Sequence, residues 1–381
     1  MNDTKAHKKP KLRFPKFHVG WETKALGKIT LVNPSSEKLP DEFIYIDLES
    51  VTHGTLIQEN YISKSNAPSR ARRVLKKGDI LFQTVRPYQQ NNFYFDLEGV
   101  YVASTGYAQL RSDENLRFIY YYLHTRKFLQ EVLIKCTGTN YPAINSNDLK
   151  EIELRIPIDQ EQLKIASFLT SVDEWITNLK AQKEALEKHK KGVMQKIFSQ
   201  EMRFKDENGN VFPEWEIRNL GEICNITTGK LDANAMKQDG PYRFYTCAKE
   251  YYQIDKYAFD TEALLVSGNG ANVGYIHYYK GKFNAYQRTY VLDTFTANIM
   301  FIKTFLQKEL HRRISEEKKA GNTPYIVMGT LSDMPISLPT LDEQQKIASF
   351  LSSIDDMIDA KENQIAKAEV WKRGLMQGLF V

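Results

Sequence analysis

The 381-residue sequence has few cysteines and no long apolar run. Its three cysteines, Cys136, Cys224 and Cys247, form no Cys-x-x-Cys pair, and no histidine lies at ligand spacing from them, so a structural zinc site is not expected. So few cysteines are typical of a reducing compartment, and we expect a cytoplasmic protein. The absence of a stretch of about 18 apolar residues argues against a membrane span. No apolar segment follows the basic N-terminus, so a signal peptide is not expected either.

The sequence also lacks the short motifs of common enzymes. It has no Gly-x-x-x-x-Gly-Lys-Ser/Thr phosphate loop, no Gly-x-Ser-x-Gly turn and no His-Glu-x-x-His pair. The Asn/Asp-Pro-Pro-aromatic tetrapeptide of amino-methyltransferases is missing, because Asn140-Tyr-Pro142 lacks the Pro-Pro step. Gly268-x-Gly270 does not open a helix as a dinucleotide loop must. We therefore expect a chain without catalytic activity, cofactor or metal of its own.

The composition is that of an ordinary globular protein. Hydrophobic residues make up 42% of the chain and charged residues 26%, which argues against a largely disordered chain. The formal net charge of +5 permits nucleic acid as a partner but does not identify one. The arrangement of residues along the chain is more informative than their totals.

The chain contains one internal repeat at an offset of 182 residues (346 − 164). Lys164-Ile-Ala-Ser-Phe-Leu169 recurs as Lys346-Ile-Ala-Ser-Phe-Leu351, and residues 157–198 share 19 identities in 42 positions with residues 339–380, without a gap. Other matches at this offset are Glu161-Gln162 with Glu343-Gln344, Asp173 with Asp355, Met194-Gln195 with Met376-Gln377 and Phe198 with Phe380. Such a repeat indicates that one structural unit is used twice.

A shorter match precedes each copy. Trp21-Glu-Thr-Lys-Ala-Leu-Gly-Lys-Ile29 resembles Trp215-Glu-Ile-Arg-Asn-Leu-Gly-Glu-Ile223, with Phe14-Pro15 and Phe212-Pro213 before them. The chain should therefore consist of a Trp-Glu motif, a variable domain and a long helix, followed by the same three parts again. The sequence leaves open the role of the basic segment 1–20, which carries Lys5, Lys8, Lys9, Lys11 and Arg13.

Residues 160–198 have the pattern of a long amphipathic helix. No proline interrupts them, and Gly192 is their only glycine. Apolar residues recur at spacings of three, four or multiples of seven, which predicts a coiled-coil seam. The seam residues are Leu169, Val172, Ile176, Leu179, Leu186, Val193 and Ile197 in the first copy, and Leu351, Ile354, Ile358, Ile365, Leu375 and Leu379 in the second.

The two seams carry polar residues at different places. Lys183 stands where the second copy has Ile365, and Lys361 stands where the first has Leu179. A long helix cannot bury an apolar stripe alone, and different interruptions favour specific pairing. We therefore expect the two helices to pair with each other, antiparallel, and to hold the two domains at a fixed distance. A coiled coil that only dimerises the chain is the alternative.

The two variable domains are expected to combine strands with one main helix. Strand-like runs include Gly78–Phe82 and Glu262–Val266. The main helix is predicted over residues 114–134 in the first domain, with Asp113 as its N-cap, and over residues 297–317 in the second. Each helix precedes a glycine and a proline–aromatic loop, Gly138-Thr-Asn-Tyr-Pro142 and Gly321-Asn-Thr-Pro-Tyr325, which we interpret as structural.

Basic and amide side chains make both domains candidates for binding nucleic acid. A basic cluster in the first domain is predicted to bind phosphates, with a solvated loop as the alternative. Arginine can bind guanine, and glutamine or asparagine can bind adenine, each through two hydrogen bonds. The candidates in the first domain are Arg70, Arg72, Arg73, Lys76, Lys77, Gln83, Arg86, Gln89, Gln90, Asn91 and Asn92. Those in the second domain are Asn269, Asn272, Lys282, Gln287 and Arg288, near the glycine-rich stretch 267–274, where the backbone should be able to approach a ligand closely.

Two dissimilar domains, each followed by nearly the same long helix, resemble the specificity subunit of Type I restriction–modification systems. The resemblance covers essentially the whole chain. It is carried by residues 342–351 with their twin at 159–169, by the Trp-Glu motifs, and by the Met-Gln-x-x-Phe pattern at 194–198 and 376–380. It implies that each domain is a target recognition domain for one half of a split site in double-stranded DNA, and that the helices fix the gap between the halves.

The fold that this resemblance implies is α+β, with a pseudo-twofold internal repeat and two target recognition domains separated by an antiparallel coiled coil. Its parts are a basic N-terminal segment (1–21), the first recognition domain (22–156), the first spacer helix (157–200), a linker with the second Trp-Glu motif (201–215), the second recognition domain (216–338) and the second spacer helix (339–381).

The resemblance also implies partners. Two methyltransferase subunits would bind the helices, and restriction subunits would join the larger complex. These partners would bind S-adenosylmethionine, ATP and magnesium, whereas the chain itself would bind DNA, without catalysis and without a membrane. The alternatives are a coiled-coil assembly scaffold that does not read sequence, and a fused methyltransferase or nuclease.

Overall fold

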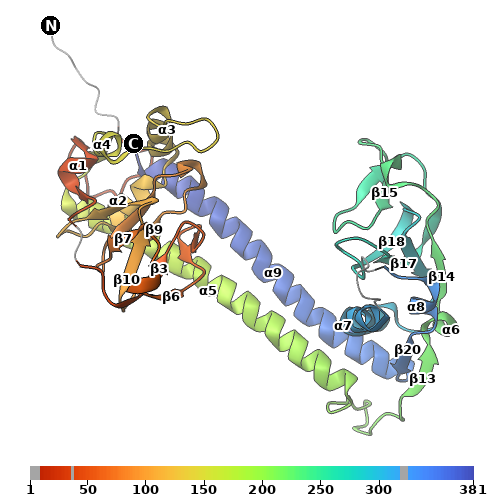
Figure 1. Cartoon of the computed structure of the whole chain (residues 1–381). Coiled ribbons are helices and arrows are strands. Elements are labelled where there is room, and N and C mark those ends of the chain that lie inside the picture. Colours follow the sequence, from red (N-terminus) through yellow and green to blue (C-terminus); the bar gives the residue numbers. More distant parts are fainter. Residues whose placement is uncertain (1–8, 36–37, 318–324) are drawn as a thin grey trace. The chain divides into compact units, whose positions relative to one another are not determined.

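The computed structural model describes residues 9–35, 38–317 and 325–381 (Figure 1). Lys5, Lys8 and residues 321–324 of the second proline–aromatic loop, which the sequence singled out, lie outside these residues. The chain divides into two compact units: unit 1 comprises Met1–Leu179 with Gln364–Val381, and unit 2 comprises Lys180–Asn363. Each unit therefore combines one variable domain with parts of both long helices.

Unit 1 is an α+β structure in which most of the described strands form two four-stranded sheets, in the orders β6-β3-β10-β7 and β2-β11-β8-β9, while β1 pairs with β12 and β4 with β5. Its elements before the long helix are β1 (Glu22–Ala25), α1 (Leu26–Ile29), β2 (Leu31–Val32), β3 (Glu42–Ile46), β4 (Val51–Thr52), β5 (Thr55–Leu56), β6 (Asn60–Ser63), η1 (Lys64–Asn66), β7 (Ala71–Val74), β8 (Ile80–Gln83), η2 (Pro87–Gln89), β9 (Phe93–Tyr94), β10 (Tyr101–Ser104), β11 (Tyr107–Arg111), α2 (Arg117–Leu123), α3 (Arg126–Ile134), α4 (Ser146–Lys150) and β12 (Glu153–Ile156). The first and last of these strands, β1 and β12, pair antiparallel and close the domain.

The single helix predicted over residues 114–134 is wrong, because the segment forms two helices, α2 and α3. The break lies at His124 and Thr125, and the Thr125 hydroxyl accepts a hydrogen bond from the backbone N–H of Phe128 at 3.3 Å. Threonine is a good N-cap, so it begins a new helix where the pattern alone predicts continuation. Asp113 is not the cap of α2, whose N-cap position is Leu116.

Unit 2 is also α+β and contains one six-stranded sheet in the order β14-β19-β17-β18-β15-β16. Its elements between the long helices are β13 (Glu216–Asn219), α6 (Leu220–Ile223), β14 (Asn225–Thr228), η3 (Ala233–Ala235), β15 (Tyr242–Tyr245), β16 (Tyr252–Ile254), β17 (Phe259–Ser267), β18 (Ile276–Ala285), β19 (Thr289–Asp293), α7 (Ile299–Glu317), α8 (Met328–Ser332) and β20 (Pro335–Leu338). The helix predicted over residues 297–317 is α7, and the Asn298 side chain caps it by accepting from the N–H groups of Met300 and Phe301. Strands β13 and β20 pair as β1 and β12 do in unit 1.

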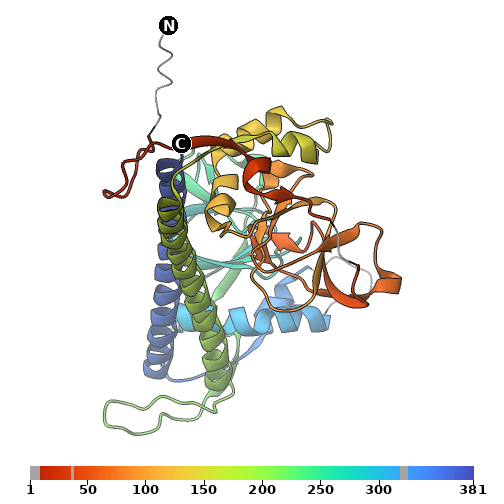
Figure 2. The ribbon, with the colours of Figure 1, turned by 90° about the vertical axis from the view of Figure 1, so that its left-hand side faces the viewer.

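The two predicted long helices are α5 (Asp159–Phe198) and α9 (Leu341–Leu379). Within unit 2 their segments lie side by side (Figures 1 and 2) and are joined by ion pairs. Lys190 binds Asp355 at 2.6 Å, and Lys183 binds Glu362 at 3.2 Å. Residue numbers rise along α5 as they fall along α9, so the predicted antiparallel pairing is confirmed in this unit. Lys183, the polar residue in the first seam, makes a specific contact across the pair.

The same pairing holds within unit 1. Lys372 of α9 binds Asp173 of α5 at 2.5 Å, and by the 182-residue offset this pair is the counterpart of Lys190 with Asp355 in unit 2. Predicted seam residues fill the contact, since Leu169 and Val172 are 0% and 4% exposed.

In each unit the end of one long helix packs into the core of the domain. Phe380, near the end of α9, lies 5.3 Å from Phe118 of α2 in unit 1, measured between ring centroids. Phe198, at the end of α5, lies 5.6 Å from Phe301 of α7 in unit 2. Each domain therefore packs against the beginning of the long helix that follows it and against the end of the other long helix.

Each unit contains a buried arginine–glutamate pair, and its arginine precedes the Trp-Glu motif in the sequence. In unit 1, Arg13 Nε and Nη2 donate to the two carboxylate oxygens of Glu161 at 2.8 and 2.7 Å, and the Glu161 side chain is 1% exposed. In unit 2, Arg203 donates to Glu343 at 3.2 and 2.8 Å, and the Glu343 side chain is fully buried. Residues around Arg13 therefore have a structural role that the sequence left open.

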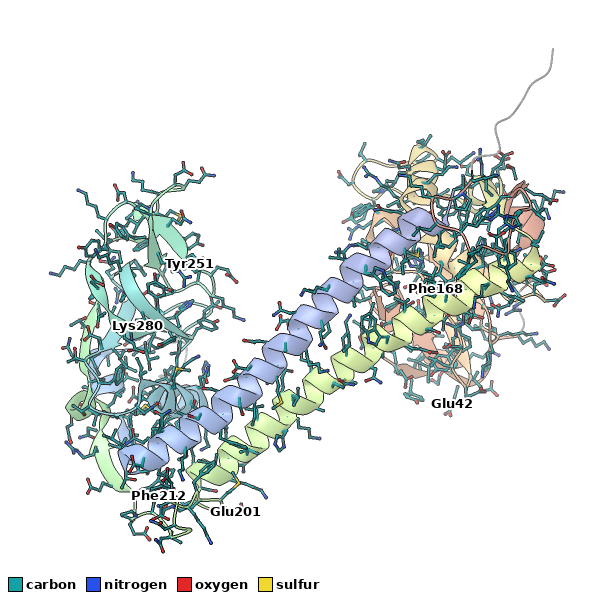
Figure 3. The ribbon with its side chains drawn as sticks, turned by 180° about the vertical axis from the view of Figure 1, so that it is seen from behind. Glu42, Phe168, Glu201, Phe212, Tyr251 and Lys280 are labelled. Atoms are coloured by element: carbon teal, nitrogen blue, oxygen red, sulfur yellow. The ribbon has the colours of Figure 1, made fainter. Side chains whose placement is uncertain are left out.

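These pairs correct the sequence alignment of the two copies. Arg13 corresponds to Arg203, so Phe14 corresponds to Phe204 and not to Phe212. The Phe14 ring lies 5.8 Å from that of Phe168, which is labelled in Figure 3, as Phe204 lies 5.7 Å from Phe350. A Phe-Pro dipeptide occurs before both Trp-Glu motifs. In unit 2, however, the phenylalanine that packs as Phe14 does is Phe204, which is not part of that dipeptide.

Candidate nucleic-acid interface

Three segments of unit 1 converge at the end of β8. They are recognition loop 1 (residues 84–92), the turn between β10 and β11, and the hairpin 137–144. Thr84 N–H donates to the Gly106 carbonyl at 3.1 Å, and Arg86 N–H donates to the Pro142 carbonyl at 2.8 Å. The backbone thus holds two loops and a turn as one surface beside the exposed Arg70, whose carbonyl accepts from Thr105 N–H.

Gln83 and Asn92 were predicted to contact bases, but both side chains are 1% exposed. Gln83 Nε2 donates to Gln89 Oε1 at 2.7 Å, and Gln83 Oε1 accepts from Asn91 N–H at 3.1 Å. Asn92 Oδ1 accepts from Gln83 N–H at 2.9 Å. Their amides are therefore used inside the protein to shape recognition loop 1, which leaves Arg86, Gln89, Gln90 and Asn91 as its surface candidates.

Two of these candidates have unusual backbone conformations. Arg86 and Gln90 flank η2 with φ of 53° and 51°, the left-handed region that residues other than glycine rarely adopt. The Arg86 guanidinium lies 4.3 Å from the ring centroid of Tyr141 in the hairpin. The loop surface therefore carries a cation whose position is fixed by both backbone and ring.

The predicted basic cluster is divided between two places. Arg70 and Arg72 lie at the beginning of β7, next to recognition loop 1, and both are exposed. Arg73 is half-buried, and burial lowers the pKa of its guanidinium. Lys76 and Lys77 follow the end of β7 and lie at the opposite end of the sheet, so the five residues do not form one edge.

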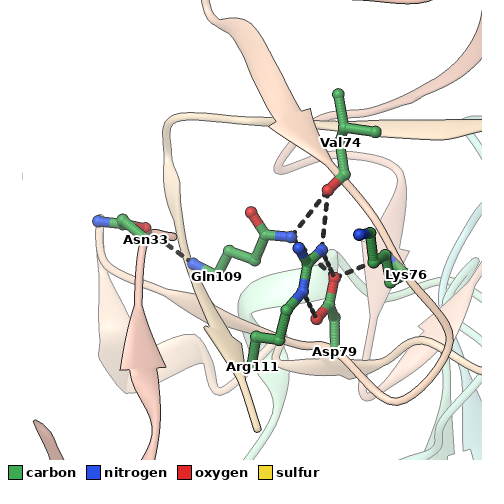
Figure 4. A network of polar contacts seen from close by, with 6 residues as sticks. All are labelled: Asn33, Val74, Lys76, Asp79, Gln109 and Arg111. Carbon is green, nitrogen blue, oxygen red and sulfur yellow. Dashed lines mark hydrogen bonds and ion pairs between the residues drawn. The ribbon is translucent and has the colours of Figure 1, made fainter. Parts of the chain in front are cut away.

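A buried polar network holds the turn that carries Lys76 and Lys77 (Figure 4). Asp79, 1% exposed, accepts from Arg111 Nε and Nη2, both at 2.7 Å, and from Gln109 Nε2 at 2.7 Å. It also accepts from Lys76 N–H at 2.7 Å. Lys77 forms an ion pair with Glu98 on the surface. This turn is structurally defined but distant from recognition loop 1.

The corresponding surface of unit 2 forms at the end of β17. Recognition loop 2 (residues 268–275) is held by Gly268 N–H, which donates to the Arg288 carbonyl at 2.8 Å. Asn272 Nδ2 donates to the Cys247 carbonyl at 3.0 Å, and Asn269 forms a β-bridge with Tyr325. The structure therefore brings together Asn269, Asn272 and Arg288, which are predicted site residues.

Two other predicted residues of unit 2 differ from that group: Gln287 directly precedes Arg288 but its amide is bound elsewhere, and Lys282 lies further along β18. Gln287 Nε2 donates to Asp232 Oδ1 at 2.7 Å. Lys282 is opposite Asp260, whereas Ile276 at the loop is opposite Val266. Six residues of strand separate Lys282 from the loop, a distance of about 20 Å.

Gly268 has a different role from the one that the sequence suggested. A Cβ atom added there would lie 2.4 Å from the Arg288 carbonyl oxygen. Glycine is therefore needed for the approach of two backbone segments of the protein itself, not for the approach of a ligand.

The sequence did not identify two further features of unit 2. The segment after β15 joins the loop surface through Cys247, whose thiol donates to the Arg288 carbonyl at 3.3 Å. On β15, the Arg243 guanidinium lies 4.3 Å from the ring of Tyr251, labelled in Figure 3, and 4.5 Å from that of Tyr279. Aromatic–arginine contacts across neighbouring strands depend on sheet order, so no local sequence signal predicts them.

The two loop surfaces share a backbone frame and differ in side chains. Ile144 N–H donates to the Thr84 carbonyl in unit 1, as Ile326 N–H donates to the Gly268 carbonyl in unit 2. Two positions further along, unit 1 carries Arg86 where unit 2 carries a glycine. The two units therefore present different side chains on one backbone frame.

The described part of the chain contains neither a group of metal-binding side chains nor a helix suited to crossing a membrane. Over residues 9–35, 38–317 and 325–381, no three His, Cys, Asp or Glu side chains are grouped so as to hold a metal ion. No helix in these ranges is both long and apolar enough to cross a membrane. The three cysteines are free thiols, and burial raises the pKa of Cys224 to about 12.

The sequence of the chain is similar to those of one described protein family and of several of its members. Residues 18–188 and 213–370 match the family described as Type I restriction modification DNA specificity domain. The Type I restriction enzyme EcoDI specificity subunit of Escherichia coli is 38% identical over 157 residues, which are 41% of this chain and 35% of that protein. The MjaVIII specificity subunit of Methanocaldococcus jannaschii is 25% identical over 311 residues, 73% of each protein.

A solved structure shows the same fold. The S subunit of a Type I restriction-modification system from M. genitalium superposes with a TM-score of 0.65 at 18% identity, over 98% of this chain and 99% of that one. The family match covers both variable domains and most of both long helices. The chain therefore belongs to the Type I restriction modification DNA specificity family and contains two copies of its domain.

Proposed function

We propose that this chain is the specificity subunit of a Type I restriction–modification complex, in which each unit reads one half of a split DNA site. The observation that carries the proposal is the double family match on two units with one backbone frame and different loop side chains. The paired helices α5 and α9 would set the gap between the half-sites.

The proposed partners follow from the family. Two methyltransferase subunits would bind the helices, and restriction subunits would complete the complex. S-adenosylmethionine, ATP and magnesium would be bound by those partners, and this chain would direct their chemistry without catalysing it. Action on cellular DNA would place the complex in the cytoplasm.

Base and phosphate contacts are proposed for the candidates at the two loop surfaces that are exposed or partly exposed. These are Arg70, Arg72, Arg86, Gln89, Gln90 and Asn91 in unit 1, and Asn269, Asn272 and Arg288 in unit 2. A coiled-coil scaffold that does not read sequence is the less favoured alternative, because a scaffold has no need of two different loop surfaces on one frame.

Replacement of Arg288 with alanine is expected to weaken recognition of one half-site only. The residue is exposed beside recognition loop 2, and loss of a base contact costs about 1–3 kcal/mol. Binding of the methyltransferase complex to DNA with either half-site scrambled would measure the effect. Lys282→Ala is the matched control, because Lys282 is also an exposed cation of unit 2 but lies away from the loop. Equal losses at both half-sites would contradict the division of reading between the units.

A further inference from the structure

The hairpin 137–144 of unit 1 carries an exposed aromatic side chain on a fixed backbone. Thr137 and Ala143 exchange two backbone hydrogen bonds, both 2.9 Å long. Gly138 has a φ of +90°, and a Cβ atom there would lie 3.2 Å from the Tyr141 carbonyl oxygen. Tyr141 itself is 63% exposed, so its ring contributes little to the core.

Arg86 is held directly beside this ring. Its N–H donates to the Pro142 carbonyl at 2.8 Å, and Val85 forms a β-bridge with Ala143. Its left-handed backbone is costly for a residue with a side chain and persists only where surrounding contacts enforce it. The buried amides of Gln83 and Asn92 provide part of that enforcement.

The contact between the two side chains restricts Arg86 without occupying its hydrogen-bonding edge. The guanidinium carbon lies 4.3 Å from the Tyr141 ring centroid, and a guanidinium packed over an aromatic ring can present its flat face to that ring. The N–H donors lie in the plane of the guanidinium, at its edge. Arginine in this arrangement can donate two hydrogen bonds to the O6 and N7 atoms of guanine, which is the commonest specific contact in the major groove.

We propose that Arg86 and Tyr141 form a binding site for a guanine base in the half-site read by unit 1. Arg86 contacts the base, and Tyr141 is a positioning residue that holds the guanidinium. The proposal rests on the proposed function of the chain and deepens it by naming the ligand. The proline–aromatic loop, which the sequence suggested to be purely structural, then takes part in recognition.

The test uses the complete methyltransferase complex and DNA that carries its mapped site. Arg86→Met is expected to weaken binding by about 5- to 150-fold, and Tyr141→Leu by about 2- to 30-fold. Tyr141→Phe keeps the ring and should bind as the unaltered complex does. Tyr61→Leu replaces another exposed tyrosine of unit 1, on β6, and should have no effect.

A modified base separates recognition from folding. Each guanine of the unit 1 half-site is replaced in turn with 7-deazaguanine, which lacks the N7 acceptor. The unaltered complex should lose affinity at one position, and Arg86→Met should lose this sensitivity while its recognition of the other half-site stays unchanged. That unchanged half-site shows that the variant is folded.

Three results would overturn the guanine site. One is a loss of affinity for Arg86→Met that is equal on target and unrelated DNA, which indicates a phosphate contact. Another is a unit 1 half-site without guanine, and the third is a Tyr141→Phe variant as weak as Tyr141→Leu. In each case a split methylation motif would still support the proposed function, whereas the absence of any split motif would count against that function itself.

Discussion

Replacement of Arg13 with alanine is expected to lower the free energy of unfolding of unit 1 by about 3–5 kcal/mol. The variant would leave the Glu161 carboxylate, whose side chain is 1% exposed, without the two hydrogen bonds that Arg13 donates. A buried charge that loses its partner is far more costly than a lost surface pair. For a unit of this size the change corresponds to a fall in Tm of about 6–20 °C.

Scanning calorimetry would measure this effect and distinguish the unfolding of unit 1 from that of unit 2. Arg203→Ala should destabilise unit 2 for the same reason but by less, because the fully buried Glu343 keeps the hydrogen bond that Trp215 Nε1 donates at 3.0 Å. Lys11→Ala, at an exposed lysine in the same segment as Arg13, should change stability by less than about 0.5 kcal/mol. A similarly small change for Arg13→Ala would contradict the structural role assigned to this segment.

Insertion of one heptad into both long helices is expected to lengthen the gap between the half-sites by about three base pairs. Seven helical residues add about 10.5 Å, and the rise of DNA is about 3.4 Å per base pair. The insertions belong between Leu179 and Lys180 and between Ile365 and Ala366, which keeps the register of the ion pairs from Lys190 to Asp355 and from Asp173 to Lys372.

Methylation mapping of the lengthened chain would give the new gap directly. Three added base pairs also rotate one half-site relative to the other by roughly 100° about the DNA axis. One added heptad does not rotate the two ends of a coiled coil by the same angle. The lengthened chain should therefore bind its new site more weakly than the unaltered chain binds its own. Insertion into α5 alone breaks the register and should abolish modification. An unchanged gap in the double insertion would mean that the helices do not set the distance.

The long helices could be predicted from the sequence because their signal is local. The repeat and the seam spacing around Leu169 and Leu351 need no knowledge of the fold, and Lys183 indicated pairing between unlike helices. The helix predicted over residues 114–134 was wrong because a local signal alone did not decide the outcome. Thr125 can cap a new helix, and the packing of Phe128 in the core decides that it does so.

The loop surfaces could be predicted only in part. The stretch around Arg86 was identified because arginine and amide side chains suit base contacts. The same composition could not show that Gln83 and Asn92 point inward, since burial depends on β9 and β11 beside them. The pairing of Arg13 with Glu161 joins residues 148 positions apart. The contact between Arg86 and Tyr141 depends in the same way on a hairpin far along the chain.

The most direct test of the proposed function is a map of methylated adenines. The chain would be co-expressed with its cognate methyltransferase subunit in a host without adenine methylation, and the host DNA would be sequenced for the modification. The account predicts one split motif, with two specified halves and a fixed gap. A correctly assembled complex that leaves the DNA unmodified, or that modifies one continuous motif, would contradict it.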